Sequence, residues 1–400
     1  MNKVSMLLVL LLIVLAFFKV YCGIPAEDGF YQTRDEGAYF DYSVRLAQQG
    51  FGRYTDMVGD YFADKKNWSG PFPFRVGYVF VTATAFKVFG PSFRAMAVIS
   101  LICYILLVGF SFYFTRKSFG TFFAAGCALL LAFSPLQMAM ARRALPDSMG
   151  CFLVILSLWL FLRFISEGCR VRDLVSFVFA YTAAMLVKEQ FLLLLPLFAL
   201  MALVYKYKYG AGLRPAHLFA IIAMPLVMSL AVWYLTAGRF MLAACGIVMN
   251  IRQLAPYAQD FCRGPWPTYI IDYFLISPVT TFLGLSFFCY KFIGRSWLDD
   301  QRVWFFAAAA AWVYLAFSGI DGFKNVRYVL VLDVFLRLFV MLALDKLFDG
   351  QRLKTFYMSL AVLGLVYLDY FNFDYLFCAI GLYDPVSYWL LKARLMIPAG

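Results

Sequence analysis

Residues 4–20 are VSMLLVLLLIVLAFFKV, a nearly unbroken apolar run that Lys3 precedes. A helix needs about 20 apolar residues to cross roughly 30 Å of hydrocarbon, so this run predicts a first membrane span. The run also resembles a signal peptide. No small-x-small cleavage pattern follows it, and Phe17, Phe18 and Lys19 form a poor approach to one. We therefore expect a retained span, with cleavage as the alternative.

The apolar character extends over the whole chain. Of its 400 residues, 64% are hydrophobic and 14% are charged, and the mean hydropathy is +0.77. A soluble domain is roughly half apolar and one quarter charged. The apolar residues form long blocks rather than the short alternating strands of a β-barrel. Because backbone groups in lipid must be paired within their own segment, the sequence predicts an all-α, polytopic transmembrane helical bundle.

The apolar blocks define the expected organisation of the chain, with about 11 spans in a single integral membrane domain over residues 1–400. A long polar loop over residues 23–93 follows the first span, and a tail without a soluble domain covers residues 372–400. The remaining spans are expected near residues 94–114, 119–139, 148–165, 174–187, 190–205, 217–236, 270–292, 303–318, 327–346 and 355–371.

The long first loop contains two expected juxtamembrane helices. Between Glu36 and Gln49, apolar residues recur on one helical face, and Gly50 follows. This pattern predicts an amphipathic helix lying along the membrane surface. Residues 76–89 are apolar but short, and Lys87 interrupts them. They are expected to form a second interfacial helix rather than a span.

The distribution of positive charge predicts the orientation. With the N-terminus inside, every alternate loop on the inner side is basic, as the positive-inside rule requires. The residues concerned are Arg116, Lys117, Arg163, Arg170, Arg172, Lys206, Lys208, Arg214, Lys291, Arg295, Arg302, Lys346, Arg352 and Lys354. The opposite loops mix both signs and would face the periplasm, a lumen or the exterior. The bacterial inner membrane is the favoured location.

Several classes of function are disfavoured. The net charge of +12 is spread over short topological clusters, without the basic stripe of a nucleic-acid binder. The single His217 lies at the start of a span and cannot supply a multi-histidine metal site. Walker A and GxGxxG patterns are absent, so no nucleotide site is expected. Cys245 and Cys262 share one loop and could pair if it is oxidised.

The first candidate site is Arg34-Asp35-Glu36-Gly37, which opens the predicted surface helix. Two adjacent carboxylates at a membrane surface could supply a general base or hold a divalent cation. The alternative is structural: Asp35 caps the helix, and Glu36 favours its positive N-terminal end.

The second candidate site is the segment ARRALPDS over residues 141–148. Pro146 and Asp147 suit the first turn of a helix, which is the structural alternative. That alternative does not account for Arg142 and Arg143 on the outer side, where positive charge is disfavoured. Arginine presents a fork that matches phosphate, so these residues are candidate ligands of a lipid phosphate.

Two further charged segments lie on the predicted outer side. Lys188 and Glu189 stand between two spans with almost no loop, and intramembrane charge of this kind indicates a functional site. Lys324, Arg327 and Tyr328 open another span. The alternatives are an ion pair that punctuates a helical hairpin and side chains that reach to lipid headgroups.

Asp333 and Arg337 follow inside the last of these spans. Their i, i+4 spacing predicts an ion pair, and we interpret that pair as structural.

The order and sidedness of these motifs resemble the GT-C superfamily of membrane glycosyltransferases, above all family 39, the protein mannosyltransferase and aminoarabinose transferase group. The matching positions are Asp35 and Glu36, Arg143 to Asp147, Lys188 and Glu189, and Arg327 and Tyr328. The segment from Pro71 to Gly90, followed by Pro91 and Ser92, is also similar to the one that precedes the second span in that family.

The resemblance implies transfer of a sugar from a polyprenyl-phosphate donor to a glycan, lipid or protein acceptor. It makes Asp35 the first catalytic candidate and Glu36 the second. Asp147 becomes a further acid, and these three carboxylates are the candidate ligands if a divalent metal takes part. Arg142, Arg143, Lys188 and Arg327 would stabilise the leaving phosphate.

The main alternative from another class is a transporter or flippase of lipid-linked sugars. It is disfavoured because no inverted repeat and no paired Gly/Pro-broken helix is evident. A non-catalytic membrane subunit is a third alternative. An O-antigen ligase or polymerase is a rival within the enzyme class.

Overall fold

A computed structural model of the chain describes residues 3–25, 34–64, 67, 71–240, 265–294, 300–319 and 324–379. Within these ranges the regular structure is helical throughout and contains no strand, which confirms the predicted all-α class. The pairing of Cys245 with Cys262 and the tail from residue 380 onward lie outside the described residues.

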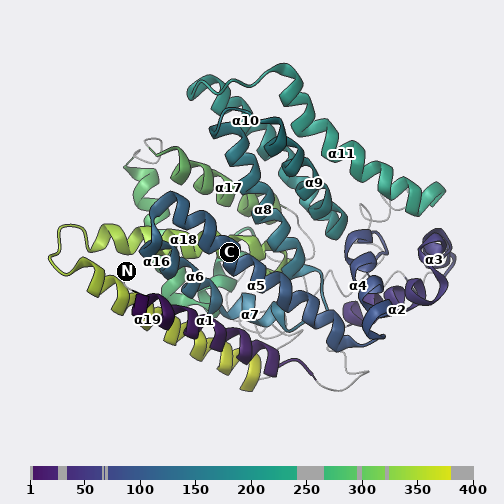
Figure 1. Cartoon of the computed structure of the whole chain (residues 1–400), viewed down its shortest axis with the longest axis horizontal. Coiled ribbons are helices and arrows are strands. Elements are labelled where there is room, and N and C mark those ends of the chain that lie inside the picture. The colour runs from purple at the N-terminus through teal and green to yellow at the C-terminus, as the bar shows by residue number, and fades with distance from the viewer. Residues whose placement is uncertain are drawn as a thin grey trace. The chain divides into compact units, whose positions relative to one another are not determined.

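The helices follow one another along the chain as Figure 1 shows. The α-helices are α1 (Lys3–Cys22), α2 (Arg34–Gln49), α3 (Tyr54–Ala63), α4 (Val76–Phe89), α5 (Phe93–Phe119), α6 (Thr121–Ala132), α7 (Pro135–Ala141), α8 (Asp147–Ser166), α9 (Val171–Val187), α10 (Leu195–Lys208), α11 (Pro215–Ala237), α15 (Thr268–Ile276), α16 (Pro278–Ile293), α17 (Gln301–Ser318), α18 (Leu330–Leu347) and α19 (Lys354–Phe373). The shorter 3-10 and π segments are η1 (Phe51–Arg53), η3 (Glu189–Leu194), η4 (Gly238–Phe240), η6 (Val326–Val329) and η7 (Asp374–Ala379).

Helices α2 and α4 confirm that the long first loop contains two helices at the expected positions. Six described helices are long and apolar enough to cross a membrane, or seven if α6 and α7 form one bent span. The chain is an integral membrane protein. The number of about 11 spans, the interfacial placement of α2 and α4 and the orientation stay predictions.

Two segments predicted as single spans are broken helices, which corrects the expectation for residues 119–139 and 270–292. Helices α6 and α7 meet at an angle of 59°. Helices α15 and α16 are separated by Ser277, whose φ of −142° and ψ of 72° are not helical. Each break is a Ser-Pro step, at Ser134 and at Ser277. Proline removes a backbone donor and disfavours helical geometry in the residue before it. The expectation that the chain has no paired broken helices is therefore wrong.

The chain divides into two compact units. Unit 1 comprises Met1–Ile24, Leu101–Arg142 and Phe261–Gly400, and unit 2 comprises Pro25–Ser100 and Arg143–Asp260. Each unit is described below by itself. The single membrane domain over residues 1–400 stays a prediction.

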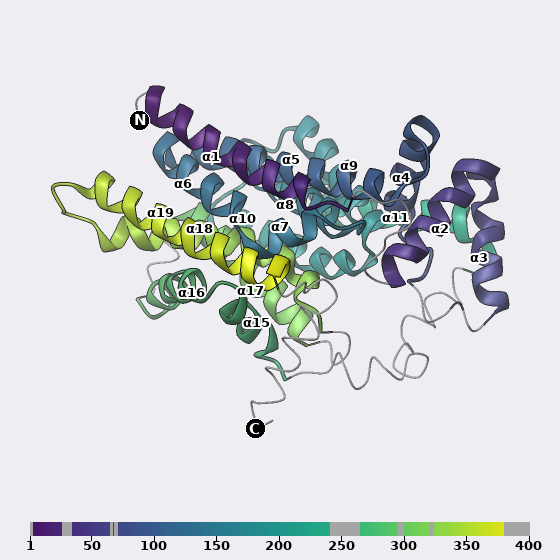
Figure 2. The ribbon, with the colours of Figure 1, turned by 90° about the horizontal axis from the view of Figure 1, so that it is seen from below.

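In unit 1, α18 packs against α6, α16 and α17, and α1 and α19 both pack against α6 and α7. Figures 1 and 2 show α1 and α19 running alongside each other, and Lys19 Nζ lies 2.7 Å from Asp374 Oδ1 where they end. Buried apolar side chains of α6 and α18 form much of the interior, including Leu130, Leu131, Val340 and Met341.

In unit 2, α2 packs on α4, α4 packs on α9, and α9 packs on α8 and α11. Figure 2 shows α2, α3 and α4 gathered together at one end of this unit. The interior contains a cluster of aromatic rings from α8, α9 and α10. The centroid of the Phe198 ring lies within 4.9 Å of the ring centroids of Phe161, Phe177 and Tyr181. The succession of packed helices brings the start of α2, the start of α4, the start of α8 and the end of α9 together.

Candidate functional site

The first ion pair of unit 2 joins the first predicted motif to the second. Arg143 Nε donates to Glu36 Oε1 over 2.8 Å, and the Ala144 backbone N–H donates to the same oxygen over 3.1 Å. The Arg143 and Glu36 side chains are only 2% and 4% exposed. Glu36 lies in the first turn of α2, so this pair attaches that turn to the segment that enters α8. The Ser100 hydroxyl also holds the segment by donating to the Leu145 carbonyl over 3.0 Å.

The second ion pair joins the start of α8 to the end of α9. Lys188 Nζ donates to Asp147 Oδ1 over 2.8 Å, and both side chains are 2% exposed. Gly150, one turn along α8, makes this approach possible. A Cβ atom there would lie 2.7 Å from the Phe191 ring and 3.4 Å from Lys188 Cδ. The Tyr181 hydroxyl fixes Phe191 by donating to its carbonyl over 2.8 Å.

The third ion pair contains a residue that sequence reasoning missed. Arg75 forms a two-point fork with Glu189, from Nε to Oε2 over 3.1 Å and from Nη2 to Oε1 over 3.2 Å. Arg75 also donates to the Tyr39 hydroxyl. The Arg75 and Glu189 side chains are 14% and 28% exposed, so this is the most accessible of the three pairs. The available signal was an arginine directly before the apolar run over residues 76–89.

Close packing holds Arg75 in place from both sides. A Cβ atom on Gly77 would lie 3.2 Å from the backbone of Leu186, so a glycine lets α4 approach α9 closely. The Trp233 indole N–H donates to the Phe74 carbonyl over 3.1 Å, and the two rings stack with centroids 4.7 Å apart. These contacts fix the backbone on which Arg75 stands.

Asp35 differs from its neighbour in exposure. It lies in the first turn of α2 and is half-buried, whereas Glu36 is buried. A carboxylate in the first turn is favoured by the positive end of the helix dipole. The burial of Glu36 therefore fixes the turn that presents Asp35.

Three side chains of α2 and α3 have pKa values above their usual range. Burial raises the pKa of the Tyr42 and Tyr54 hydroxyls, so both remain protonated donors. Tyr42 donates to the Pro71 carbonyl over 3.0 Å, and Tyr54 donates to the Pro73 carbonyl. Desolvation also raises the pKa of the Asp41 carboxyl. The two tyrosines thus hold the loop that leads into Arg75.

The remaining predicted site residues lie in unit 1. Arg142 donates from Nε to the Gly23 carbonyl over 3.0 Å and from Nη1 to Cys378 Sγ over 3.1 Å. Its guanidinium lies 5.6 Å from the centre of the Phe373 ring. A Cβ atom on Gly23 would lie 2.5 Å from Arg142 Nε, so only glycine fits there without a shift. Arg142 therefore joins the end of α1 to the end of α19.

The late motif of the sequence occupies the entry to α18. Buried Lys324 donates from Nζ to the Pro265 carbonyl over 3.1 Å. The Arg327 backbone N–H donates to Asn325 Oδ1 over 3.1 Å, which caps η6. The Arg327 guanidinium lies 5.5 Å from the centre of the Tyr328 ring.

The described residues do not fit a divalent metal site. Of the three carboxylates predicted as ligands, Glu36 binds Arg143 and Asp147 binds Lys188. In the described part of the chain, no group of three or more His, Cys, Asp or Glu side chains could hold a metal. His217 has a structural role instead, because its Nδ1 accepts from the Arg214 backbone N–H over 3.3 Å at the start of α11.

Comparisons with known proteins show what the chain is similar to. Residues 75–233 match the sequence profile of dolichyl-phosphate-mannose-protein mannosyltransferases. The matched segment begins at Arg75 and also includes Arg143 and Lys188, the cations of the other two pairs. No curated protein sequence is a significant match.

Two solved structures show the fold. ArnT from Cupriavidus metallidurans bound to undecaprenyl phosphate superposes with a TM-score of 0.60 at 16% identity, covering 99% of this chain and 76% of ArnT. The oligosaccharyltransferase AglB from Archaeoglobus fulgidus, in complex with an inhibitory peptide and a dolichol-phosphate, superposes with a TM-score of 0.58 at 14% identity. That match covers 93% of this chain and 56% of AglB, so the chain spans about half of the archaeal enzyme. The resemblance indicated by the motifs is confirmed: residues 75–233 are similar to the dolichyl-phosphate-mannose-protein mannosyltransferase family, and the chain shares the helical fold of ArnT and AglB.

Proposed function

We propose that the protein transfers a sugar from a polyprenyl-phosphate carrier to an acceptor hydroxyl on the outer face of the membrane. The matched family uses dolichyl-phosphate mannose, and the two similar structures hold undecaprenyl phosphate and dolichol-phosphate. These observations support a lipid phosphate as the carrier. The acceptor is a glycan, a lipid or a protein, and the bacterial inner membrane is the favoured location.

The observation that carries the proposal is the different environment of two neighbouring carboxylates. Glu36 Oε1 accepts from both Arg143 and the Ala144 backbone N–H, in a pair with little exposure. Asp35, in the same turn, keeps part of its side chain exposed, which supports it as the group that meets the substrate. Asp35 is thus the catalytic carboxylate, and Glu36 positions it through the first turn of α2.

The reaction is a displacement at the anomeric carbon. Asp35 accepts or orients the proton of the acceptor hydroxyl while the acceptor oxygen bonds to that carbon. The bond from the carbon to the phosphate oxygen breaks, and the lipid phosphate leaves with the electron pair. Attack from the opposite side inverts the configuration.

Negative charge develops on the departing phosphate and requires cations nearby, because such electrostatic terms are often the largest in catalysis. Among Arg75, Arg143 and Lys188 of unit 2, Arg75 is the most exposed, and its fork geometry also matches phosphate. Arg143 and Lys188 are too deeply buried for direct contact without rearrangement, and they act by holding the site's backbone. In unit 1, taken by itself, Arg142, Arg327 and Tyr328 are the proposed donor-phosphate residues, and buried Lys324 holds the entry to α18 through the Pro265 carbonyl.

The decisive test is transfer from synthetic radiolabelled polyprenyl-phosphate sugars to a membrane extract by the purified protein. Asp35→Asn should reduce transfer by at least about 100-fold, because it removes the proton acceptor. Asp41→Asn is the matched control, since Asp41 is a second aspartate of α2. It should retain wild-type transfer. Full activity of Asp35→Asn, with an unchanged unfolding temperature, would contradict the assignment.

A transporter or flippase of lipid-linked sugars is the second candidate. The two Ser-Pro breaks in unit 1 favour it, because transporters commonly bind substrates at discontinuous helices. Reconstituted vesicles containing a fluorescent polyprenyl-phosphate sugar distinguish the two functions. Movement of the label between leaflets, together with no transfer from any donor sugar, would favour the transporter.

A further inference from the structure

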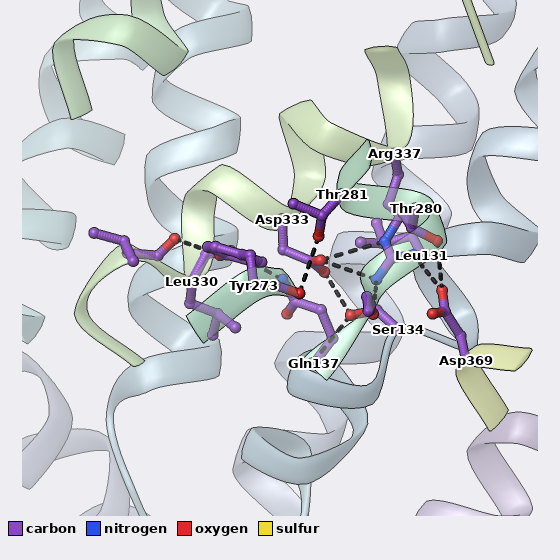
Figure 3. A network of polar contacts seen from close by, with 12 residues as sticks. Leu131, Ser134, Gln137, Tyr273, Thr280, Thr281, Leu330, Asp333, Arg337 and Asp369 are labelled. Carbon is purple, nitrogen blue, oxygen red and sulfur yellow. Dashed lines mark hydrogen bonds and ion pairs between the residues drawn. The ribbon is translucent and has the colours of Figure 1, made fainter. Parts of the chain in front are cut away.

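Unit 1 contains a buried cluster of charges that the proposed chemistry does not use (Figure 3). Arg337 donates to Asp333 Oδ1 from Nη2 over 3.1 Å and from Nε over 3.3 Å. Its Nη1 donates to Asp369. The Arg337, Asp333 and Asp369 side chains are 1%, 1% and 3% exposed. Charges in such surroundings are costly to keep and indicate a role, because apolar side chains could otherwise fill the space.

The cluster is attached to both helix breaks of unit 1. The Ser134 hydroxyl, between α6 and α7, donates to Asp333 Oδ2 over 2.5 Å. Arg337 Nη2 donates to Ser277 Oγ, between α15 and α16, over 3.2 Å. The Thr280 hydroxyl in the first turn of α16 donates to Asp369 Oδ2 over 3.2 Å. The charges therefore hold together two points where the chain is not restrained by continuous helix.

The same two broken helices also hold the entry to α18. The Tyr273 hydroxyl on α15 donates to the Val329 carbonyl over 2.9 Å. The Gln137 side chain on α7 donates from Nε2 to the Leu330 carbonyl over 3.2 Å (Figure 3). Val329 is the last residue of η6, and Leu330 is the first residue of α18. Two side chains from separate broken helices thus fix one point of the backbone.

That point lies directly after Arg327 and Tyr328. Both belong to η6, the single turn over Val326–Val329, so a movement of the Val329 carbonyl changes where the Arg327 guanidinium lies. The Tyr273 backbone is itself held, because the Thr281 hydroxyl donates to its carbonyl over 3.0 Å. Contacts thus lead from the charge cluster, through the two breaks, to the carbonyls of Val329 and Leu330, which follow Arg327 in the chain.

We propose that Tyr273 and Gln137, held by the Asp333–Arg337–Asp369 cluster, are positioning residues that place Arg327 for contact with the phosphate of the lipid carrier. This inference rests on the proposed function, in which Arg327 binds that phosphate. Gln137 and Tyr273 lie on the helices beside the two Ser-Pro breaks. The charge cluster holds the broken ends in one arrangement. The same geometry would serve any anionic lipid phosphate of a polyprenyl chain.

The test measures the dissociation constant of undecaprenyl phosphate for the purified full chain in nanodiscs. Tyr273→Phe and Gln137→Leu each remove one hydrogen bond to the turn after Arg327. Each should raise the dissociation constant by about 3- to 10-fold, as expected for one such bond. Ser229→Ala is the control, since that buried hydroxyl also donates to a carbonyl, that of Pro225 within α11 of unit 2. It should leave the dissociation constant unchanged.

A role through Arg327 predicts that the effects are not additive. In an Arg327→Ala background, Tyr273→Phe should cause no further change in the dissociation constant. A further weakening of similar size, or an equal effect of Ser229→Ala, would show a general structural role and overturn the inference.

Failure of this inference can be told from failure of the proposed function. Wild-type binding and sugar transfer, with unchanged binding by Tyr273→Phe and Gln137→Leu, would overturn the positioning role alone. No binding of undecaprenyl phosphate by the folded wild-type protein would overturn both. Asp369→Asn adds an independent variant, and it should weaken binding only where Arg327 is present.

Discussion

In unit 2 the cations Arg75, Arg143 and Lys188 pair with Glu189, Glu36 and Asp147 respectively, whereas in unit 1 a single arginine, Arg337, is shared by two carboxylates. The three pairs of unit 2 lie at the starts of α2 and α8 and at the junction of α9 with η3. The cluster of unit 1 lies inside α18 and α19, beside two helix breaks. Paired charges can thus fasten helix ends, while a shared cation can bind together segments that helical hydrogen bonds no longer connect.

The two arrangements also differ in what the removal of one group leaves behind. Breaking a one-to-one pair leaves a single buried charge. Removing Arg337 leaves two carboxylates in the same apolar surroundings, where they also repel each other. Unfolding measurements on matched variants can therefore test the comparison directly.

The largest effect is expected for Arg337→Met. Removing one partner of a buried ion pair costs about 3–5 kcal/mol, and this variant should lie at the upper end because two carboxylates lose their cation. Thermal unfolding of the purified protein in detergent measures the loss. The triple variant with Asp333→Asn and Asp369→Asn should recover most of the stability. An unchanged unfolding temperature for Arg337→Met would refute the buried cluster.

Lys188→Met should destabilise unit 2 to a smaller extent, by about 3 kcal/mol, since it removes the cation of the Asp147 pair. The double variant Lys188→Met with Asp147→Asn should be more stable than the single variant, because no charge is then left buried. The same unfolding experiment gives the coupling between the two residues. Simple addition of the two single effects would mean that Lys188 and Asp147 do not interact as the structure shows.

The smallest effect compares a glycine in each unit. Gly150→Ala places a methyl group 2.7 Å from the ring of Phe191, a residue whose carbonyl accepts from the Tyr181 hydroxyl. Overpacking should therefore cost about 1–3 kcal/mol. Gly126→Ala in unit 1 meets the flexible end of Met341, 2.5 Å away, which can move aside. Its cost should be below about 1 kcal/mol, because alanine also favours the helix. Equal losses for the two variants would show that the rigidity of the neighbour does not decide the cost.

Much of the fold and part of the site were predictable from local patterns. The apolar blocks located the helices, and the i, i+4 spacing of Asp333 and Arg337 predicted their ion pair, which the structure confirms at 3.1 Å. The Ser-Pro steps at residues 134–135 and 277–278 were visible breaks. They were overlooked because the hydropathy on both sides continues without interruption.

The partners of the site residues were not predictable in the same way. Glu36 and Arg143 are 107 residues apart, and Arg75 and Glu189 are 114 residues apart. Nothing local distinguishes Asp369, a lone acid in an apolar helix, from an exposed one. The motif residues were correctly singled out as unusual, but the sequence left open whether each would meet a substrate or another side chain.

By itself the sequence determined that this protein is a helical membrane protein, because apolar runs of this length have no other means of pairing their backbone groups in lipid. It also determined the motifs on which the likeness to sugar transferases rests. Only the tertiary structure decided that Glu36 pairs with Arg143, that Arg75 lies beside Glu189, and that two broken helices converge on the Asp333–Arg337 pair. The physical reason is that a buried charge is stabilised by whichever opposite charge the packing of distant helices brings to it, and helix packing is not encoded within any single segment.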